Sequence, residues 1–343
     1  MKNAKNQGII ITQTPLRISL FGGGSDLPEH FNVSGGSVLG MAINKYVYVT
    51  INSLERLQDK KIKLSYSKLE IVDSPLELNH QIVKNILIDT PFFNNDSFID
   101  IHSYSDLPSS SGLGSSSSFT VGMLNALYYL NGVFKTPKFI AKNAITIERV
   151  KMKEKGGWQD QIFASYGGFN KISFFNNSFN VEPIAIPLEK KIYLKKSFFL
   201  IFTNLTRSSS EIQNSIKISK SIDKKQCLKM LHSFVEEGYN ILYNSKKNKE
   251  MIYELANLLH KSWEIKQNLS DKISNPHINN LYELGLKNGA LGGKLCGAGG
   301  GGFLLFIVPQ ENQVKFLEKF SKYHILNFDI EDSGSKILYS KLY

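Results

Sequence analysis

A tract of serines and glycines, DLPSSSGLGSSSS at residues 106–118, constrains the fold of this chain more than any other segment. The alternating segment FIDIHSYS before it predicts a β-strand, and the apolar stretch FTVGMLNALYYL after it predicts an α-helix. Glycines between a strand and a helix let the backbone approach a ligand, and the N–H groups at a helix start attract anions. The tract therefore predicts a phosphate-binding loop, with a flexible linker as the alternative. It is not a Walker A loop, because no Gly-Lys-Ser/Thr sequence follows the glycines.

A second glycine-rich segment, KLCGAGGGGFLLFIV at 294–308, runs into a predicted strand. Gly297, Gly299 and Gly302 have the G-x-G-x-x-G spacing of dinucleotide-binding proteins, but that fingerprint has to open a helix. A dinucleotide-dependent oxidoreductase is therefore disfavoured. Two interpretations stay open, an anion-binding nest of backbone N–H groups and a tight turn packed against a neighbouring element.

A third segment, TPLRISLFGGGSD at 14–26, places Arg17 inside an alternating strand that ends in three glycines. Arg17 has the same parity as Ser19 and Phe21, so the strand can direct the guanidinium toward a cleft near the glycine turn. Asp26 follows the glycines, where it is either a ligand-binding acid or the N-cap of the next helix.

Two acidic residues are weaker candidates for a catalytic site. Asp160, in GGWQDQ at 156–161, lies in the first turn of a short helix, where the helix dipole favours an acid whatever its function. Glu148 lies late in the preceding predicted helix and is by default a solvated glutamate. The seven histidines form no local metal-binding motif, and nucleophile-elbow and protein-kinase motifs are absent from the sequence. Hydrolase and protein kinase are therefore excluded.

Alternation of apolar and polar residues predicts strands at 9–12 and 16–21 and a final pair of strands, and helical spacing predicts helices at 138–150 and 211–222. The length of 343 residues predicts two domains, with the boundary in the proline- and lysine-containing stretch 187–196. Lys and Arg outnumber Asp and Glu by 41 to 30, but the lysines are scattered, so we expect no nucleic-acid or membrane partner. The sequence has no membrane-spanning apolar run, no signal peptide and only two cysteines, which lie far apart. We therefore expect a cytoplasmic protein.

The order of the three glycine-rich segments resembles the GHMP kinase superfamily, whose three motifs match TPLRISLFGGGSD, LPSSSGLGSSSS and KLCGAGGGGFLLFIV. The resemblance covers essentially the whole chain. It implies an α+β, two-domain GHMP kinase fold, with an ATP-binding domain at 1–187 like ribosomal protein S5 domain 2 and a ferredoxin-like domain at 188–343. It also implies ATP and Mg²⁺ as cofactors and a small-molecule acceptor.

The resemblance implies a role for each matching residue. Asp160 is implied to be the catalytic acid that orients the attacking hydroxyl, and Arg17 to pair with it and keep it ionised. Glu148 is implied to bind Mg²⁺ together with Ser116, or alternatively Ser115. The implied nucleotide-binding residues are Pro108, Ser110, Ser111, Gly112, Leu113, Gly114, Ser115, Ser116 and Ser117. The implied substrate-binding residues are Gly23, Gly24, Ser25, Asp26, Arg207, Lys294, Gly299 and Gly300.

Within the superfamily the chain is most similar to bacterial D-glycero-D-manno-heptose 7-phosphate kinases, on the triple glycine, GGWQDQ, FTNLTRSSS at 202–210 and HKSWEIKQNLS at 260–270. This similarity implies phosphorylation of the anomeric hydroxyl to the 1,7-bisphosphate, for nucleotide-activated heptose and surface polysaccharide. The substrate's own phosphate then needs a second anion site, for which Arg207 is the first candidate and Lys294 the second. An L-fucose-type kinase, a phosphomevalonate kinase and a non-catalytic sugar sensor are the alternatives, and a homodimer is possible.

Overall fold

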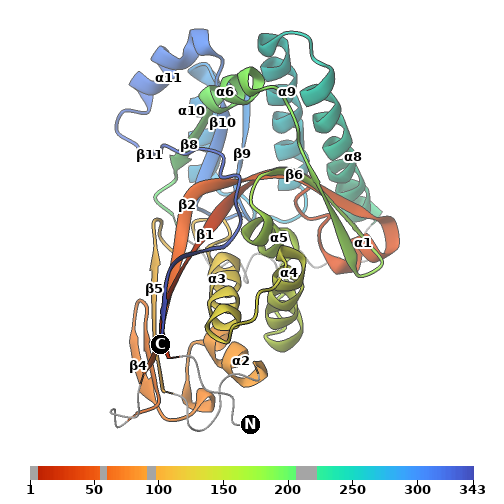
Figure 1. Cartoon of the computed structure of the whole chain (residues 1–343). Helices are drawn as coiled ribbons and strands as arrows, with labels where there is room; N and C mark the ends of the chain where they lie inside the picture. The colour runs from red at the N-terminus through yellow and green to blue at the C-terminus, as the bar shows by residue number, and fades with distance from the viewer. Residues whose placement is uncertain (1–6, 55–59, 91–97, 206–221) are drawn as a thin grey trace.

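The computed structural model describes residues 7–54, 60–90, 98–205 and 222–343, and within these ranges it contains an eight-stranded and a four-stranded sheet (Figure 1). The strands of the first sheet are β1 (Gly8–Phe21), β2 (Gly36–Leu54), β3 (Ile62–Ser65), β4 (Leu69–Val72), β5 (Phe98–Ser105), β6 (Phe169–Phe175), β7 (Ser178–Pro183) and β12 (Lys336–Leu342). The strands of the second are β8 (Phe198–Phe202), β9 (Gly292–Leu295), β10 (Phe303–Ile307) and β11 (Ile325–Leu326). The α-helices are α1 (Pro28–Ser34), α2 (Gln81–Asp89), α3 (Ser115–Leu130), α4 (Pro137–Ile145), α5 (Gln159–Tyr166), α6 (Leu188–Ser197), α8 (Ile222–Asn244), α9 (Asn248–Gln267), α10 (Pro276–Lys287) and α11 (Gln313–Lys319).

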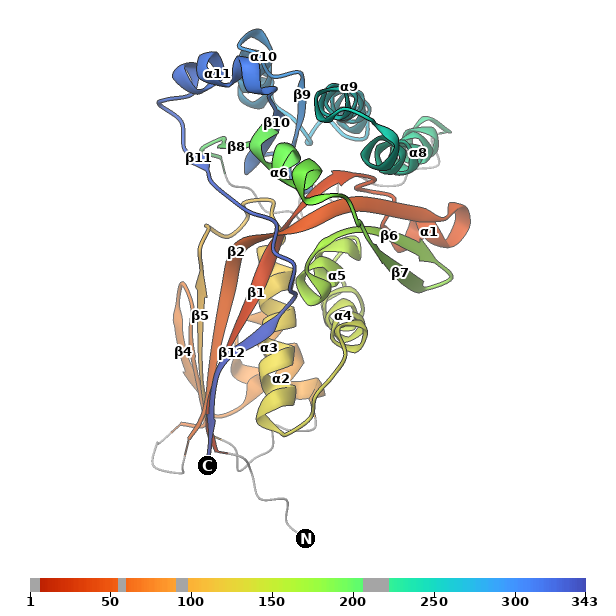
Figure 2. The same ribbon diagram turned by 45° about the horizontal axis from the view of Figure 1, so that its top comes forward.

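The first sheet takes the order β12-β1-β2-β5-β3-β4, and β6 joins it through β2 and pairs in turn with β7. β1 and β2 are long antiparallel partners of 14 and 19 residues. The first part of β2 pairs with β6 and the last part with β5, so this one strand connects both regions of the sheet. Helices α3, α4 and α5 lie together on one side of it (Figure 2). Helix α3 also packs on β1, and near its start the Ser118 hydroxyl donates to the carbonyl oxygen of Pro15 at 2.8 Å, so this end of the helix lies beside the part of β1 that carries Arg17.

The second sheet takes the order β11-β8-β10-β9, with all neighbours antiparallel. Counted along the chain, its four strands therefore lie in the order 4-1-3-2. Helices α8, α9 and α10 connect the first strand to the second, and α11 connects the third to the fourth. This β-α-β-β-α-β arrangement is the ferredoxin-like fold that the sequence predicted for the C-terminal half.

The two strands predicted at 9–12 and 16–21 form the single strand β1. The proline between them, Pro15, lies where the register with β2 shifts, between Pro15 and Leu16. A bulge is one of the few places where a sheet accepts a proline, because the ladder of hydrogen bonds is interrupted there. The continuous strand carries Arg17 to the glycine turn at its end.

The stretch 187–196, predicted as the domain boundary, forms most of the helix α6, which follows β7 of the first sheet and precedes β8 of the second, and the boundary itself stays a prediction. Only Leu194 and Ser197 of this helix are buried, so its sequence carries no apolar stripe. One other prediction needs correction. The helix predicted at 138–150 ends as α4 at Ile145 and continues as a π-helical turn, Thr146–Lys151. The helix predicted at 211–222 lies outside the described residues apart from its last position.

The last strand, β12, pairs with residues Gly8 to Gln13 of β1. The sequence predicted a final strand pair, but β11 belongs to the second sheet and β12 to the first. The end of the chain therefore returns to the N-terminal sheet, and the domain division into 1–187 and 188–343 stays a prediction. In the ranges that the structure describes, no helix is both long and apolar enough to cross a membrane.

Candidate active site

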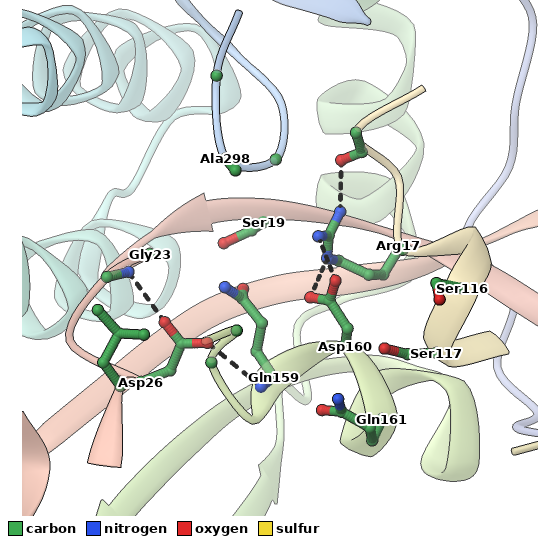
Figure 3. A pocket seen from close by; sticks show the side chains of 18 of the residues that line it. Arg17, Ser19, Gly23, Asp26, Ser116, Ser117, Gln159, Asp160, Gln161 and Ala298 are labelled. Carbon is green, nitrogen blue, oxygen red and sulfur yellow. Dashed lines mark hydrogen bonds and ion pairs between the residues drawn. The ribbon is translucent and has the colours of Figure 1, made fainter. Parts of the chain in front are cut away.

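A cavity of about 200 Å³ lies where the end of β1, the start of α3, the start of α5 and the glycine loop before β10 meet (Figure 3). Its wall contains residues from all three glycine-rich segments and from the two acidic segments. The predicted site residues that line it are Arg17, Gly23, Gly24, Asp26, Ser110, Gly112, Gly114, Ser115, Ser116, Ser117, Glu148, Asp160, Lys294 and Gly299. The fold thus brings together groups that lie up to 282 positions apart in sequence, from Arg17 to Gly299.

The other predicted site residues that the structure describes are not part of the cavity wall. Ser25, Ser111, Leu113 and Gly300 are buried, and Pro108 is exposed. The Ser25 hydroxyl lies 2.8 Å from the carbonyl oxygen of Gly22 and 2.7 Å from that of Ser37, so its side chain shapes the glycine turn. Arg207 lies outside the described residues. Binding roles for these five described residues and for Arg207 stay predictions.

The serine and glycine loop is held tightly from both sides. Gly112 and Gly114 have φ values of +80° and +84°, a conformation that side chains rarely adopt. A Cβ atom on Gly112 would lie 2.6 Å from the carbonyl oxygen of Cys296, and one on Gly297 would lie 2.7 Å from the Cα of Gly112. The second glycine-rich segment therefore packs backbone to backbone against the first while it also borders the cavity. The backbone N–H of Arg17 also donates to the carbonyl oxygen of Leu113 in this loop, at 3.0 Å. A loop held on both sides in this way is not a flexible linker, so the linker alternative is wrong.

Arg17 and Asp160 form a two-point ion pair at the centre of the site (Figure 3). The Arg17 Nε and Nη2 atoms donate to Oδ1 and Oδ2 of Asp160, both at 2.8 Å, and Nη1 donates to the carbonyl oxygen of Gly112 at 2.7 Å. Arg17 is 5% exposed, while the side chain of Asp160 is 25% exposed and faces the cavity. Two parallel charged hydrogen bonds fix the plane of the carboxylate. The arrangement can therefore hold one hydroxyl group in a defined direction.

Asp26 also lines the cavity and is buried. Its Oδ1 accepts from the backbone N–H of Gly24 at 2.9 Å, and its Oδ2 accepts from that of Gln159, the first residue of α5, at 3.3 Å. Burial raises the pKa of this carboxyl group, and the hydrogen bonds oppose the rise. The N-cap alternative is wrong, because α1 is capped at Leu27 without a side-chain hydrogen bond. Gly157 is needed beside it, since a Cβ there would lie 1.8 Å from Asp26 Oδ2.

Glu148 is buried in the π-helical turn, so its interpretation as a solvated helix residue is wrong. Its Oε2 accepts hydrogen bonds from the Ser117 hydroxyl at 2.8 Å and from the Gln161 amide. Its Oε1 has no hydrogen-bond partner within the described part of the chain, and burial raises its pKa to about 7. The Ser117 hydroxyl donates to this carboxylate and the Thr120 hydroxyl also stabilises its charge, whereas Ser116, the predicted partner, lines the cavity at the start of α3 (Figure 3).

Two buried lysines complete the wall. Lys294 donates to the carbonyl oxygens of Ser19 and Leu20 at 2.9 and 3.0 Å, and Lys266 donates to that of Gly297 at 2.6 Å. Burial lowers the pKa of Lys294 to about 7 and that of Lys266 to about 8. The sequence reasoning missed Lys266, together with the lining residues Ser19, Glu154, Gln159 and Gln161. Lys266 had a signal, because it continues the buried stripe Leu255, Leu259 and Ser262 of α9 at helical spacing.

Comparison with known proteins gives matches along most of the chain. Residues 79–168 match the GHMP kinases N terminal domain, and residues 242–325 match the GHMP kinases C terminal domain. The chain is 34% identical over 344 residues to D-glycero-alpha-D-manno-heptose 7-phosphate kinase of Campylobacter jejuni. This alignment covers 95% of this chain and 98% of that protein.

Solved structures agree with the fold. A D-glycero-D-manno-heptose 1-phosphate kinase from Bacteroides thetaiotaomicron superposes with a TM-score of 0.76 at 24% identity, over 96% of this chain and 99% of that one. A putative sugar kinase from Campylobacter jejuni superposes with a TM-score of 0.73 at 28% identity, over the whole of both chains. The predicted α+β, two-domain architecture is confirmed.

Proposed function

The chain belongs to the GHMP kinases, phosphotransferases that use an alcohol group as acceptor and ATP as donor, and we propose that its acceptor is D-glycero-D-manno-heptose 7-phosphate. The proposed product is the 1,7-bisphosphate, formed by phosphorylation of the anomeric hydroxyl. The relative at 34% identity bears the name of this kinase, which supports the choice of acceptor. We further propose that the product feeds nucleotide-activated heptose and surface polysaccharide, and that the enzyme works in the cytoplasm, as a monomer or a homodimer.

The Arg17–Asp160 pair is the observation that carries this proposal. Phosphoryl transfer needs little covalent help from the protein and depends on positioning and charge stabilisation. A carboxylate with a fixed plane can accept the proton of the acceptor hydroxyl or align it with the γ-phosphate. Because Arg17 also binds the carbonyl group of Gly112, the same guanidinium ties this carboxylate to the phosphate-binding loop. The distance between acceptor and donor sites is thereby set by one rigid side chain.

We propose that the triphosphate binds at the start of α3. The loop 108–114 precedes this 16-residue helix, and Ser115, Ser116 and Ser117 form its first turn. The free N–H groups and the dipole at a helix start attract phosphate oxygens. Gly112 and Gly114, which have no side chain to block the approach, leave this backbone open to the cavity.

The residues present fit a Mg²⁺ ion beside the triphosphate. Mg²⁺ binds oxygen atoms, usually from one or two carboxylates together with substrate phosphates and water. Glu148 Oε1 is buried at the cavity wall and has no hydrogen-bond partner among the described residues, and we propose it as such a ligand, with Ser116 or Ser115 as the accompanying hydroxyl. When bound, the ion would neutralise charge on the transferring phosphate. The Ser117 and Gln161 hydrogen bonds hold the Glu148 carboxylate in place for it.

We propose that the sugar lies between Asp160 and Asp26, over the glycine turn. Asp26 accepts two backbone N–H bonds, so the unused lone pairs of its carboxylate can accept from sugar hydroxyls. Gly23 and Gly24 form the floor on this side, and Gly299 and Gly300 belong to the loop on the other. Arg207 and Lys294 stay our candidates for the phosphate that the acceptor already bears.

The proposal is tested by Mg²⁺-dependent ADP release with a panel of acceptors, namely D-glycero-D-manno-heptose 7-phosphate, mannose 6-phosphate, L-fucose, galactose and phosphomevalonate. We expect the highest kcat/KM with the heptose phosphate and no release without Mg²⁺. Faster turnover of L-fucose or phosphomevalonate would assign a different acceptor. MgATP binding without turnover of any acceptor would favour a sugar sensor over an enzyme.

A further inference from the structure

Lys266 and Lys294 are two buried cations that share one side of the cavity. They are 8% and 3% exposed and come from different elements, α9 and β9. Their hydrogen bonds in the structure go to backbone carbonyl groups, which carry no full charge. Among the described residues no ion pair joins either ammonium group to a carboxylate. Asp26 attracts both lysines, but from beyond ion-pair distance, so their buried charge is only partly compensated and the pair is set up to receive an anion.

The ammonium groups keep hydrogen-bond donors for such an anion. A lysine ammonium has three N–H donors. Lys266 uses one of them, for Gly297, and Lys294 uses two, for Ser19 and Leu20. Both residues line the cavity, so the remaining donors have access to a bound molecule. Three unused donors from two side chains suit the several oxygen atoms of a phosphate group.

Ser19 provides a second, independent indication of a ligand. It is 6% exposed, it lines the cavity, and its Oγ has no hydrogen-bond partner in the described residues (Figure 3). Its own carbonyl group accepts a hydrogen bond from Lys294, so this lysine is anchored on the residue that carries the hydroxyl. Its Oγ would lie 3.6 Å from a Cβ on Gly23, which puts it beside the glycine turn. A buried hydroxyl without a partner among the described residues, on the same cavity wall as two ammonium groups that bind only carbonyl oxygens there, is explained by a polar ligand.

The separation of Ser19 and Arg17 along β1 gives the distance between the lysine side of the cavity and the proposed site of phosphoryl transfer. Ser19 and Arg17 are two positions apart on one strand, so their side chains share a face and their Cα atoms are roughly 7 Å apart. Arg17 holds Asp160, which is proposed to orient the acceptor hydroxyl. One small sugar can therefore present a hydroxyl to Asp160 and a second group to the lysines.

We propose that Lys266, Lys294 and the Ser19 hydroxyl form the site that holds an anionic substituent of the acceptor. This inference rests on the proposed function, under which the substituent is the phosphate of the heptose 7-phosphate. The lysine pair is then the specificity determinant for phosphorylated over neutral sugars. Lys266 and Ser19 lie inside segments that carry the family resemblance, HKSWEIKQNLS and TPLRISLFGGGSD, but no binding role was predicted for either of them from the sequence.

The lysine site is tested with Lys266→Met, which keeps an unbranched side chain of similar length, and with Ser19→Ala, which removes a hydroxyl that has no hydrogen-bond partner among the described residues. Lys261→Met, an exposed lysine on the same helix, is the matched control. Loss of a charged hydrogen bond predicts that Lys266→Met raises the KM for the heptose phosphate by about 10- to 100-fold. We expect the KM for ATP to stay within about twofold in all three variants, as for residues outside the nucleotide loop. An unchanged acceptor KM in Lys266→Met and Ser19→Ala would overturn the proposal.

A binding measurement separates this proposal from the choice of acceptor. Inorganic phosphate is titrated by calorimetry while a non-hydrolysable MgATP analogue fills the nucleotide loop. We expect binding to the wild type and to Lys261→Met, and weaker binding to Lys266→Met and Ser19→Ala, each confirmed as folded by its thermal midpoint. Equal binding to all four proteins, or none to the wild type, would overturn the lysine site. Lysine-dependent phosphate binding without turnover of the heptose phosphate would leave the lysine site standing and refute the proposed acceptor.

Discussion

Replacing Asp160 by asparagine is the sharpest perturbation of the proposed chemistry. The substitution keeps the shape of the side chain but removes its charge and turns one acceptor oxygen into an NH₂ donor. Arg17 presents two N–H groups to this side chain, each 2.8 Å from a carboxylate oxygen. In the variant, one of these N–H groups faces the NH₂ donor of the asparagine, so that hydrogen bond is lost. The carboxylate that is proposed to take or align the hydroxyl proton is lost at the same time.

The expected losses differ in size for catalysis and for stability. Loss of a positioned proton acceptor predicts a fall in kcat of about 100- to 10,000-fold, which corresponds to about 3–5 kcal/mol of transition-state stabilisation. Breaking a buried ion pair costs about 3–5 kcal/mol of folding free energy, but Asp160 is partly exposed and the amide oxygen still accepts one bond. We therefore expect a stability loss nearer to about 1–3 kcal/mol, the cost of one unsatisfied charged group.

The assay measures ADP release at saturating substrates together with MgATP binding and thermal denaturation. We expect Asp160→Asn to bind MgATP within a few-fold of the wild type, to melt at a lower temperature and to lose turnover. Asp332→Asn is the matched control, because it removes one charge from an exposed ion pair with Lys191. A folded Asp160→Asn enzyme with more than a third of the wild-type kcat would refute the role given to this carboxylate.

Further predictions concern the metal, the loop and the buried lysines. Glu148→Gln is expected to raise the Mg²⁺ concentration needed for half-maximal velocity at least tenfold at fixed ATP, because a neutral amide binds Mg²⁺ poorly; an unchanged Mg²⁺ titration contradicts this. Gly112→Ala is expected to lower the thermal midpoint and raise the KM for ATP, because its Cβ would lie 2.6 Å from the Cys296 carbonyl oxygen at a φ of +80°; wild-type values for both would contradict the tight packing of the loop. Lys294 has a folded-state pKa of about 7, below its ordinary value of 10.5, so between these pH values the unfolded chain binds more protons and stability rises with pH. The free energy of unfolding of the wild type, relative to that of Lys294→Met, should therefore rise from pH 7 to 10. A difference that does not change with pH would contradict the burial of this ammonium group.

The sequence predicted most of the site because its chemistry is concentrated in short motifs. A strand, a glycine tract and a helix in succession determine the position of the proposed phosphate-binding loop, and alternation in β1 determines the direction of Arg17. The alternation of apolar and polar residues could not reveal that β1 continues across Pro15. The bulge that accepts this proline depends on pairing with the partner strand β2, which the sequence of β1 does not contain. Likewise, α6 has too few buried side chains to produce an apolar stripe.

Two buried charges carried a signal that periodicity could have revealed. Glu148 lies four and eight positions after the buried residues Ala144 and Ile140, and Lys266 continues a similar stripe on α9. A charged residue at an apolar position of a helix is a candidate for a functional site, because burying it has to be compensated. The choice between Ser116 and Ser117 had no such signal, since neighbouring serines differ only by their rotation about the helix axis.

The central claim is that this cavity transfers phosphate from ATP to the anomeric hydroxyl of a sugar that is already phosphorylated. The most direct measurement is the phosphorus NMR spectrum of the wild-type reaction with MgATP and D-glycero-D-manno-heptose 7-phosphate. The account predicts one new phosphate ester signal, coupled to the anomeric proton, in equal amount to the ADP formed. Orthophosphate as the only new signal besides ADP, or ATP left unconsumed, would contradict it.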